Sequence, residues 1–151
     1  MTFERLQLPS QVLEHWAFFS EGFAYLQAEA REHYDAVQMQ KLLCHLSAQP
    51  AAFVGLVIRD DGTPICFGVG EENTPLFSQT RTATVRAVYH RPGLSNATLL
   101  LAGAFETWCR EKGIKSYTVT TKRNTGAVIR CFRHRKFGFK RPFFVFEKDV
   151  I

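Results

Sequence analysis

Residues 85–97 join a run of strand-forming residues to a loop of small residues and the start of a helix. Gly93, Ser95 and Ala97 are small enough for a phosphate group to approach the main chain closely. The first turn of a helix has main-chain N–H groups without partners, and these groups attract anions. The segment therefore predicts a site for a phosphate or pyrophosphate. Many strand-to-helix turns contain a glycine without binding a ligand, so other parts of the sequence have to support this interpretation.

The charge of the chain is consistent with an anionic partner. The sequence has 19 Lys and Arg residues against 14 Asp and Glu residues, a formal net charge of +5. The basic excess is concentrated between Arg110 and Lys148. Such an excess favours a polyanion such as a phosphate, a nucleotide or a nucleic acid, but it does not distinguish among them.

The cysteines Cys44, Cys66, Cys109 and Cys131 lie far apart and form no C-x-x-C pair. They predict buried apolar residues rather than a disulfide framework or a zinc site. The histidines near the N-terminus also lack ligand spacing, so no metal is expected. No run approaches the roughly 20 apolar residues of a membrane span, and the first residues lack the pattern of a signal peptide. We expect a soluble, cytoplasmic protein.

Hydrophobic periodicity divides the chain into a helical N-terminal part and a part in which strands and helices alternate. Apolar residues recur at helical spacing over 9–49, and Ser10 is the expected cap of the first helix. Residues 53–58 and 64–70 read as strands on either side of Asp60-Asp61-Gly62, which is typical of a hairpin turn. The remaining elements are expected to be a turn at 71–79, strands at 82–89, 116–121 and 143–148, and helices at 96–112 and 125–136.

The length and composition favour one domain. The chain has 151 residues, of which 46% are apolar, enough to bury a hydrophobic core. No internal repeat, linker or low-complexity segment interrupts it. We therefore expect a single α+β domain over residues 1–151, with a mixed and mostly antiparallel sheet flanked by helices.

The loop and the elements that follow it resemble the GNAT acetyltransferase superfamily over about residues 51–149. In that family the loop contains Gln or Arg, two residues, Gly, one residue, and then Gly or Ala. The corresponding residues here are His90, Gly93 and Ser95, so the match is partial. Farther on, Asn124 begins an Asn-x-x-Ala pattern at the start of a helix, as in the family.

The resemblance implies an N-acyltransferase that transfers an acetyl group from acetyl-CoA to an amine by direct attack. Residues 51–149 would form the core that binds acyl-CoA. The main chain of Val85 and Ala87 would bond the pantetheine arm, which binds like an added strand. The resemblance also implies further donor-binding positions, which are His90, Arg91, Gly93, Leu94, Ser95, Asn96, Ala97 and Asn124.

Two groups are candidates for the acid that protonates the departing thiolate. Counting back from Gly138, the family's acid position is His134, whereas counting forward from Asn124 leads to Cys131. A histidine can donate a proton near neutral pH, but one in a basic run is more often a solvated surface residue. Glu71 and Glu72 are the candidates for the base that takes a proton from the amine.

A second class of function stays open, which is a nucleic-acid-binding protein that keeps this fold without catalysis. Basic residues over 130–141 alternate with phenylalanines, which could contact phosphates and bases. A solvated helix face with core phenylalanines explains the same pattern. An enzyme that acylates a nucleobase, a tRNA or a basic protein would combine both interpretations. The sequence does not identify the acceptor.

Overall fold

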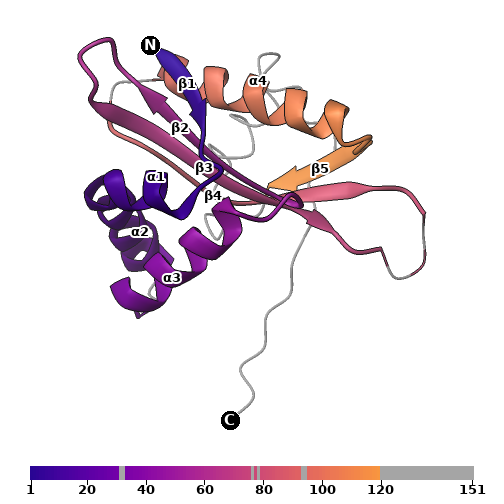
Figure 1. The fold of residues 1–151 in the computed structure, drawn as a ribbon, viewed down its shortest axis with the longest axis horizontal. Coiled ribbons are helices and arrows are strands. Elements are labelled where there is room, and N and C mark those ends of the chain that lie inside the picture. The colour runs from indigo at the N-terminus through magenta and orange to yellow at the C-terminus, as the bar shows by residue number, and fades with distance from the viewer. Residues whose placement is uncertain (31–32, 76, 78, 93–94, 120–151) are drawn as a thin grey trace. The chain divides into compact units, whose positions relative to one another are not determined.

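The computed structural model describes residues 1–30, 33–75, 77, 79–92 and 95–119. In this part of the chain one sheet has α4 on one face and α1, α2 and α3 on the other (Figure 1). The elements are β1 (Thr2–Arg5), α1 (Pro9–Glu14), α2 (Trp16–Ala30), α3 (Ala36–Ser47), β2 (Ala52–Ile58), β3 (Pro64–Asn73), β4 (Thr82–His90), α4 (Ser95–Glu111) and β5 (Ser116–Val119).

The strands follow the order β1-β2-β3-β4-β5, so each strand lies beside its neighbour in the sequence. The first four strands pair antiparallel, and β5 pairs with β4 in parallel. This arrangement confirms the predicted α+β fold with a mixed, mostly antiparallel sheet flanked by helices. The predicted helix at 125–136 and strand at 143–148 lie outside the described residues, and the single domain over 1–151 stays a prediction.

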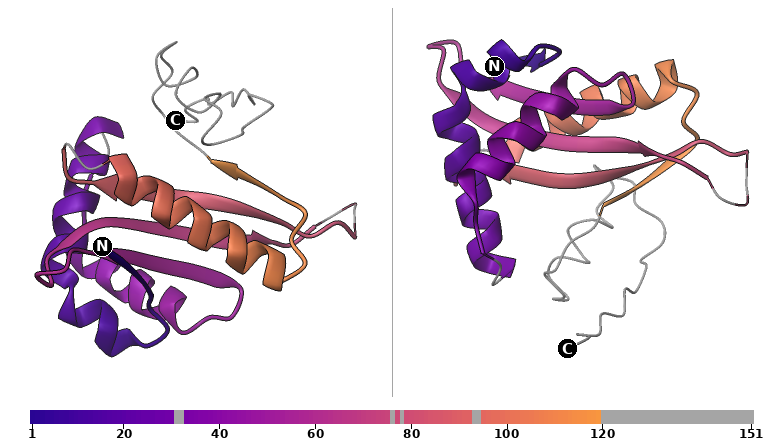
Figure 2. Two further views of the ribbon diagram at one scale, coloured as in Figure 1. Left: turned by 90° about the horizontal axis from the view of Figure 1, so that it is seen from above. Right: turned by 60° about the horizontal axis from the view of Figure 1, so that its bottom comes forward.

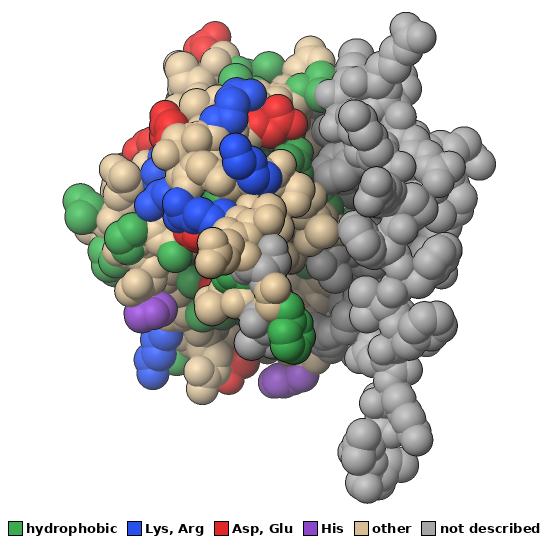
Figure 3. Space-filling view, turned by 90° about the vertical axis from the view of Figure 1, so that its right-hand side faces the viewer, with side chains coloured by type: hydrophobic (Ala, Val, Ile, Leu, Met, Phe, Trp, Pro, Cys, Tyr) green, Lys and Arg blue, Asp and Glu red, His purple; other side chains and the backbone are tan. Residues whose placement is uncertain are grey.

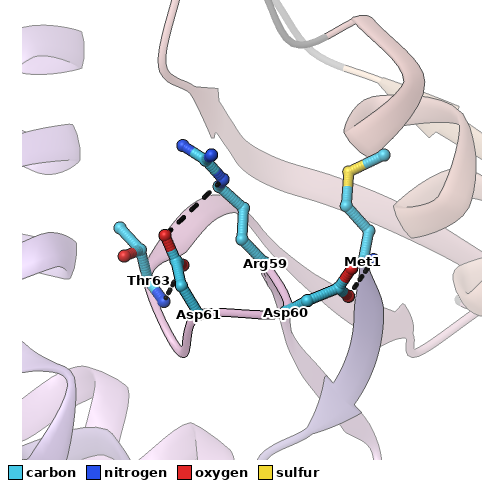
Figure 4. A network of polar contacts seen from close by, with 5 residues as sticks. All are labelled: Met1, Arg59, Asp60, Asp61 and Thr63. Atoms are coloured by element: carbon cyan, nitrogen blue, oxygen red, sulfur yellow. Dashed lines mark hydrogen bonds and ion pairs between the residues drawn. The ribbon is translucent and has the colours of Figure 1, made fainter.

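The hairpin between β2 and β3 forms where the sequence predicted it. Gly62 adopts a φ of +84°, a conformation that residues with a side chain rarely adopt. The carboxylate of Asp61 accepts a hydrogen bond of 3.0 Å from the main-chain N–H of Thr63 (Figure 4). The amino group of Met1 lies 2.6 Å from Asp60, so the start of β1 is bound to the same turn.

The prediction that Ser10 caps the first helix is wrong. The helix begins at Pro9, whose fixed φ suits the first helical position and whose missing N–H is not needed there. The side chain of Gln11 accepts hydrogen bonds from the main-chain N–H groups of Gln7 and Leu8, at 2.8 and 3.0 Å. A glutamine inside the first turn therefore reaches back to bind the main chain before the helix, and no described side chain caps the N–H groups of the first turn.

Aromatic residues fill the core on both faces of the sheet. On the face covered by α1, α2 and α3, the ring of Phe67 lies between those of Phe18, Phe19 and Phe23, with centroids 4.9 to 5.8 Å away. On the other face, Phe53 packs against Phe105 and Trp108 of α4. Among the described cysteines, Cys66 and Cys109 are buried as predicted, whereas Cys44 is half-buried.

Candidate active site

The ladder between β3 and β4 contains an irregularity at Arg86. Val69 pairs with Ala87, but the next residue of β3, Gly70, pairs with Val85. Arg86 is therefore an extra residue in β4, which forms a β-bulge. A bulge bends its strand and changes the direction in which the local main-chain groups point.

Strand β5 lies beside the first part of β4 (Figure 2). The described pairs run from Thr82–Ser116 to Val85–Val119, where the described chain ends, whereas β4 continues to His90. Within the described part of the chain, no strand covers the outer edge of β4 after Val85. An uncovered edge can accept an extended ligand as an additional strand. The positions predicted to bond pantetheine, Val85 and Ala87, lie at the start of this edge.

The prediction that 71–79 form a turn is wrong at its beginning, because β3 extends to Asn73. Glu71 and Glu72 are therefore strand residues, and each pairs with an arginine. Arg86 donates a hydrogen bond of 3.0 Å to Glu71. Arg81 donates two, of 2.6 and 2.9 Å, to Glu72. The hydrogen bond from Arg81 holds the pKa of Glu72 below its ordinary value.

The two carboxylates lie on opposite faces of the sheet, because side chains alternate along a strand. A Cβ on Gly70 would lie 2.6 Å from Phe105 of α4, so position 70 and hence Glu72 face α4. Val69 packs in the core beneath α1, α2 and α3, so Glu71 faces the N-terminal helices. Of the two carboxylates, only Glu71 lies on the face that the N-terminal helices cover.

A row of polar side chains crosses three strands on the face of Glu71. Asn73 donates to Thr82 at 3.0 Å, and Thr84 donates to Asn73 at 3.0 Å. The hydroxyl groups of Thr84 and Thr118 are 3.2 Å apart. The row therefore ties β5 to the sheet close to the bulge at Arg86. Sequence reasoning missed it, although polar residues at alternate positions in a predicted strand were the available signal.

The loop before α4 has the predicted order of strand, loop and helix. The helix begins at Ser95, one residue earlier than expected, so its first turn directly follows the loop. His90 is exposed and its Nδ1 lies 3.0 Å from the carbonyl of Arg91. Asn96 is exposed and Ala97 is buried against the sheet. Three predicted positions, Gly93, Leu94 and the side chain of Ser95, lie outside the described residues.

The remaining predicted site residues, His134 and Asn124, also lie outside the described residues, as do Cys131 and most of the C-terminal basic residues.

On the side shown in Figure 3, Lys and Arg side chains lie beside Asp and Glu side chains. That side therefore gives no support to the predicted nucleic-acid partner. Among the described residues, no group of three His, Cys, Asp or Glu could hold a metal ion. None of the described helices is long and apolar enough to cross a membrane.

Known structures share this fold over nearly the whole chain. A probable acetyltransferase superimposes with a TM-score of 0.76 at 13% identity, covering 100% of this chain and 99% of that one. Aminoglycoside 6'-N-acetyltransferase AAC(6')-Ih from Acinetobacter baumannii gives 0.69 at 14% identity, covering 99% of both chains. A GNAT family acetyltransferase from Staphylococcus aureus gives 0.68 at 13%, covering 99% and 100%. No protein-family model and no curated protein matches the sequence.

Proposed function

The chain has the fold of the GNAT acetyltransferases, and on this premise we propose that it is an N-acyltransferase that moves an acetyl group from acetyl-CoA to an amine. The observation that carries the proposal is the β-bulge at Arg86 in β4, whose side chain bonds the carboxylate of Glu71. The strand predicted to bind the donor and a carboxylate for the acceptor thus lie close together in the sheet.

The donor would bind along β4 and continue to the start of α4. The main chain of Val85 and Ala87 would bond the pantetheine arm, and the first turn of α4 would hold the phosphates through its N–H groups. The whole predicted loop, from His90 to Ala97, belongs to the proposed donor site. Arg91 is the described residue of this loop that carries a positive charge. Asn124 stays a predicted support for the donor.

The proposed chemistry is direct transfer without an acyl-enzyme. The amine nitrogen attacks the thioester carbonyl carbon, and main-chain N–H groups near the bulge at Arg86 stabilise the oxyanion. The carbon–sulfur bond then breaks, and the thiolate takes a proton from His134 or Cys131. Before the attack, Glu71 accepts a proton from the ammonium form of the amine, directly or through a water molecule, and the nitrogen releases its second proton to solvent as the amide forms. Acetyl-CoA and the amine thus yield CoA and the amide.

The acceptor that we propose is a protonated primary amine. Glu71 carries a negative charge on the face of the N-terminal helices, and the polar row of Asn73, Thr82, Thr84 and Thr118 lies beside it. A carboxylate attracts a cationic amine before it removes the proton. The similar structures include aminoglycoside acetyltransferases, so aminoglycosides belong in the first set of amines to be tested.

The proposed location is the cytoplasm, because the cysteines of the described part are free.

Two measurements test the proposal. Calorimetry with acetyl-CoA measures donor binding, and release of free thiol in the presence of aminoglycosides, polyamines or peptide amines measures transfer. We expect binding with one site and thiol release that depends on the added amine. A folded protein that binds neither acetyl-CoA nor a longer acyl-CoA would contradict the proposal.

A further inference from the structure

The carboxylate of Glu21 joins helix α2 to the residue that follows β4. Arg91 donates to Glu21 through Nε at 3.1 Å and through Nη2 at 2.8 Å, so both carboxylate oxygens are engaged. These hydrogen bonds hold the pKa of Glu21 below its ordinary value. A two-pronged pair fixes the direction of the guanidinium group as well as its distance.

Two aromatic residues hold this pair in place. The hydroxyl group of Tyr89, whose ring is buried in the sheet, donates to Glu21 at 2.9 Å. The guanidinium carbon of Arg91 lies 5.0 Å from the centre of the Phe18 ring, within the range of a cation–π contact. The ion pair is partly exposed, but the hydroxyl group of Tyr89 contacts its carboxylate and the ring of Phe18 contacts its guanidinium group.

The close approach of α2 to the sheet makes this contact possible. A Cβ on Gly22 would lie 2.3 Å from Cε1 of Phe67 and 2.7 Å from Cδ1 of Tyr89. Only a glycine permits such a short distance between the helix and the rings. Glu21, the preceding residue, is thereby brought within reach of the end of β4.

We propose that Glu21 is a positioning residue for the donor, which orients Arg91 and fixes the end of β4 where the chain leads into α4. The inference rests on the proposed function, since it assigns the phosphates of acyl-CoA to this end of the strand. Glu21 does not touch the reacting atoms, which lie near the bulge. Its loss raises the KM for acetyl-CoA and leaves kcat nearly unchanged, because disordered donor-binding groups lower affinity without changing the chemical step.

The test compares Glu21→Gln, which keeps the size of the side chain, with Glu4→Gln, a matched change on β1 far from the proposed site. We expect Glu21→Gln to weaken the calorimetric affinity for acetyl-CoA and to raise its KM about two- to fivefold, in the range of a surface ion pair. Glu4→Gln should leave both values unchanged. Glu21→Asp, which retains the charge, should recover part of the loss.

A double-mutant cycle separates positioning from a general loss of stability. If Glu21 acts through Arg91, Glu21→Gln combined with Arg91→Gln should bind acetyl-CoA no more weakly than Arg91→Gln alone. Additive losses, unchanged affinity in Glu21→Gln, or tighter binding in it would each overturn the inference. Tighter binding would mean that Glu21 competes with the donor for Arg91. If the wild-type protein does not bind acetyl-CoA, the proposed function fails instead.

Discussion

Glu71 and Glu72 are consecutive residues of β3, yet their carboxylates lie on opposite faces of the sheet and bond different arginines. Glu71 bonds Arg86 of the bulge, whereas Glu72 bonds Arg81, which precedes β4. One of the two faces carries α4 and the other carries the N-terminal helices. The two residues therefore cannot share one role, although the sequence made them equivalent candidates.

The first prediction is that Glu71→Gln slows transfer strongly while Glu72→Gln does not. A general base typically contributes about 10²- to 10⁴-fold to the rate, so we expect kcat to fall within that range. The affinity for acetyl-CoA should not change, because the amide side chain keeps the shape of the carboxylate that it replaces. Steady-state kinetics and calorimetry of both variants check this. Equal rate losses in the two variants would exclude Glu71 as the only base.

The second prediction concerns acid stability and Glu72. Arg81 lowers the pKa of Glu72 in the folded state below its ordinary value of 4.5. The ion pair of Glu72 and Arg81 therefore stabilises the folded protein fully above pH 4.5, the ordinary pKa of the group. This stabilisation is lost as the pH falls through the lower pKa of the folded state. Glu72→Gln should lower the free energy of unfolding by at most about 1 kcal/mol at pH 7, as for other partly exposed ion pairs.

Urea unfolding at pH 7 and at about pH 3 measures this difference. The gap between wild type and Glu72→Gln should narrow at the lower pH, because the unfolded state protonates Glu72 first and the folded state then loses its charge as the pH falls through the lowered pKa. A gap that is as large in acid as at neutral pH would show that the glutamine disturbs packing instead. An Arg81→Gln variant should reproduce the same pH dependence.

Local signals in the sequence predicted most of the described fold. The hairpin at Asp60-Asp61-Gly62 and the end of α4 near Gly113 depend on residues close together in the chain. The strand β1 was missed because it has only four residues and is held by pairing with residues 55–58, about 50 positions away. A segment of four residues with one apolar side chain carries no clear periodicity of its own, so a distant partner decides its structure.

The candidate site was predicted less well than the fold, for the same reason. The strand at 82–89 and the helix start after it were visible in the sequence, since each is a local pattern, whereas the strand edge was implied only by the family resemblance. The pair Glu21 and Arg91 is separated by 70 positions, and no spacing rule connects them. The opposite directions of Glu71 and Glu72 required knowing that β3 extends to Asn73, where the sequence suggested a turn.

The third prediction concerns the acid, which lies outside the described residues. A nearby proton donor helps the thiolate to leave, so His134→Ala should lower turnover about 10²-fold or more with little change in donor affinity. His134→Gln should be nearly as slow. Rates with acetyl-CoA and an accepted amine decide the point. Wild-type turnover in both variants would remove His134 from the mechanism and leave Cys131 or a water molecule as the candidate.

The last prediction compares two glycines that lie in helices but in different surroundings. An alanine at Gly22 would place its Cβ 2.3 Å from the fully buried ring of Phe67, so the helix or the ring has to shift. Crowding of this kind typically costs about 1–3 kcal/mol. A Cβ at Gly103 of α4 would meet nothing within 4 Å among the described residues. Gly103→Ala should therefore stabilise the protein by about 0.5–1 kcal/mol, because alanine loses less backbone entropy in a helix.

Urea unfolding of the two variants should thus give changes of opposite sign from the same chemical substitution. Gly22→Ala should also weaken the affinity for acetyl-CoA, because a shift of α2 moves Glu21 away from Arg91. Gly103→Ala should leave that affinity unchanged, since Gly103 lies in the middle of α4, beyond the first turn that would hold the phosphates. A Gly22→Ala variant as stable as the wild type would mean that α2 can move away from Phe67 at no cost, and the close approach of helix and sheet would then not be what holds Glu21 in place.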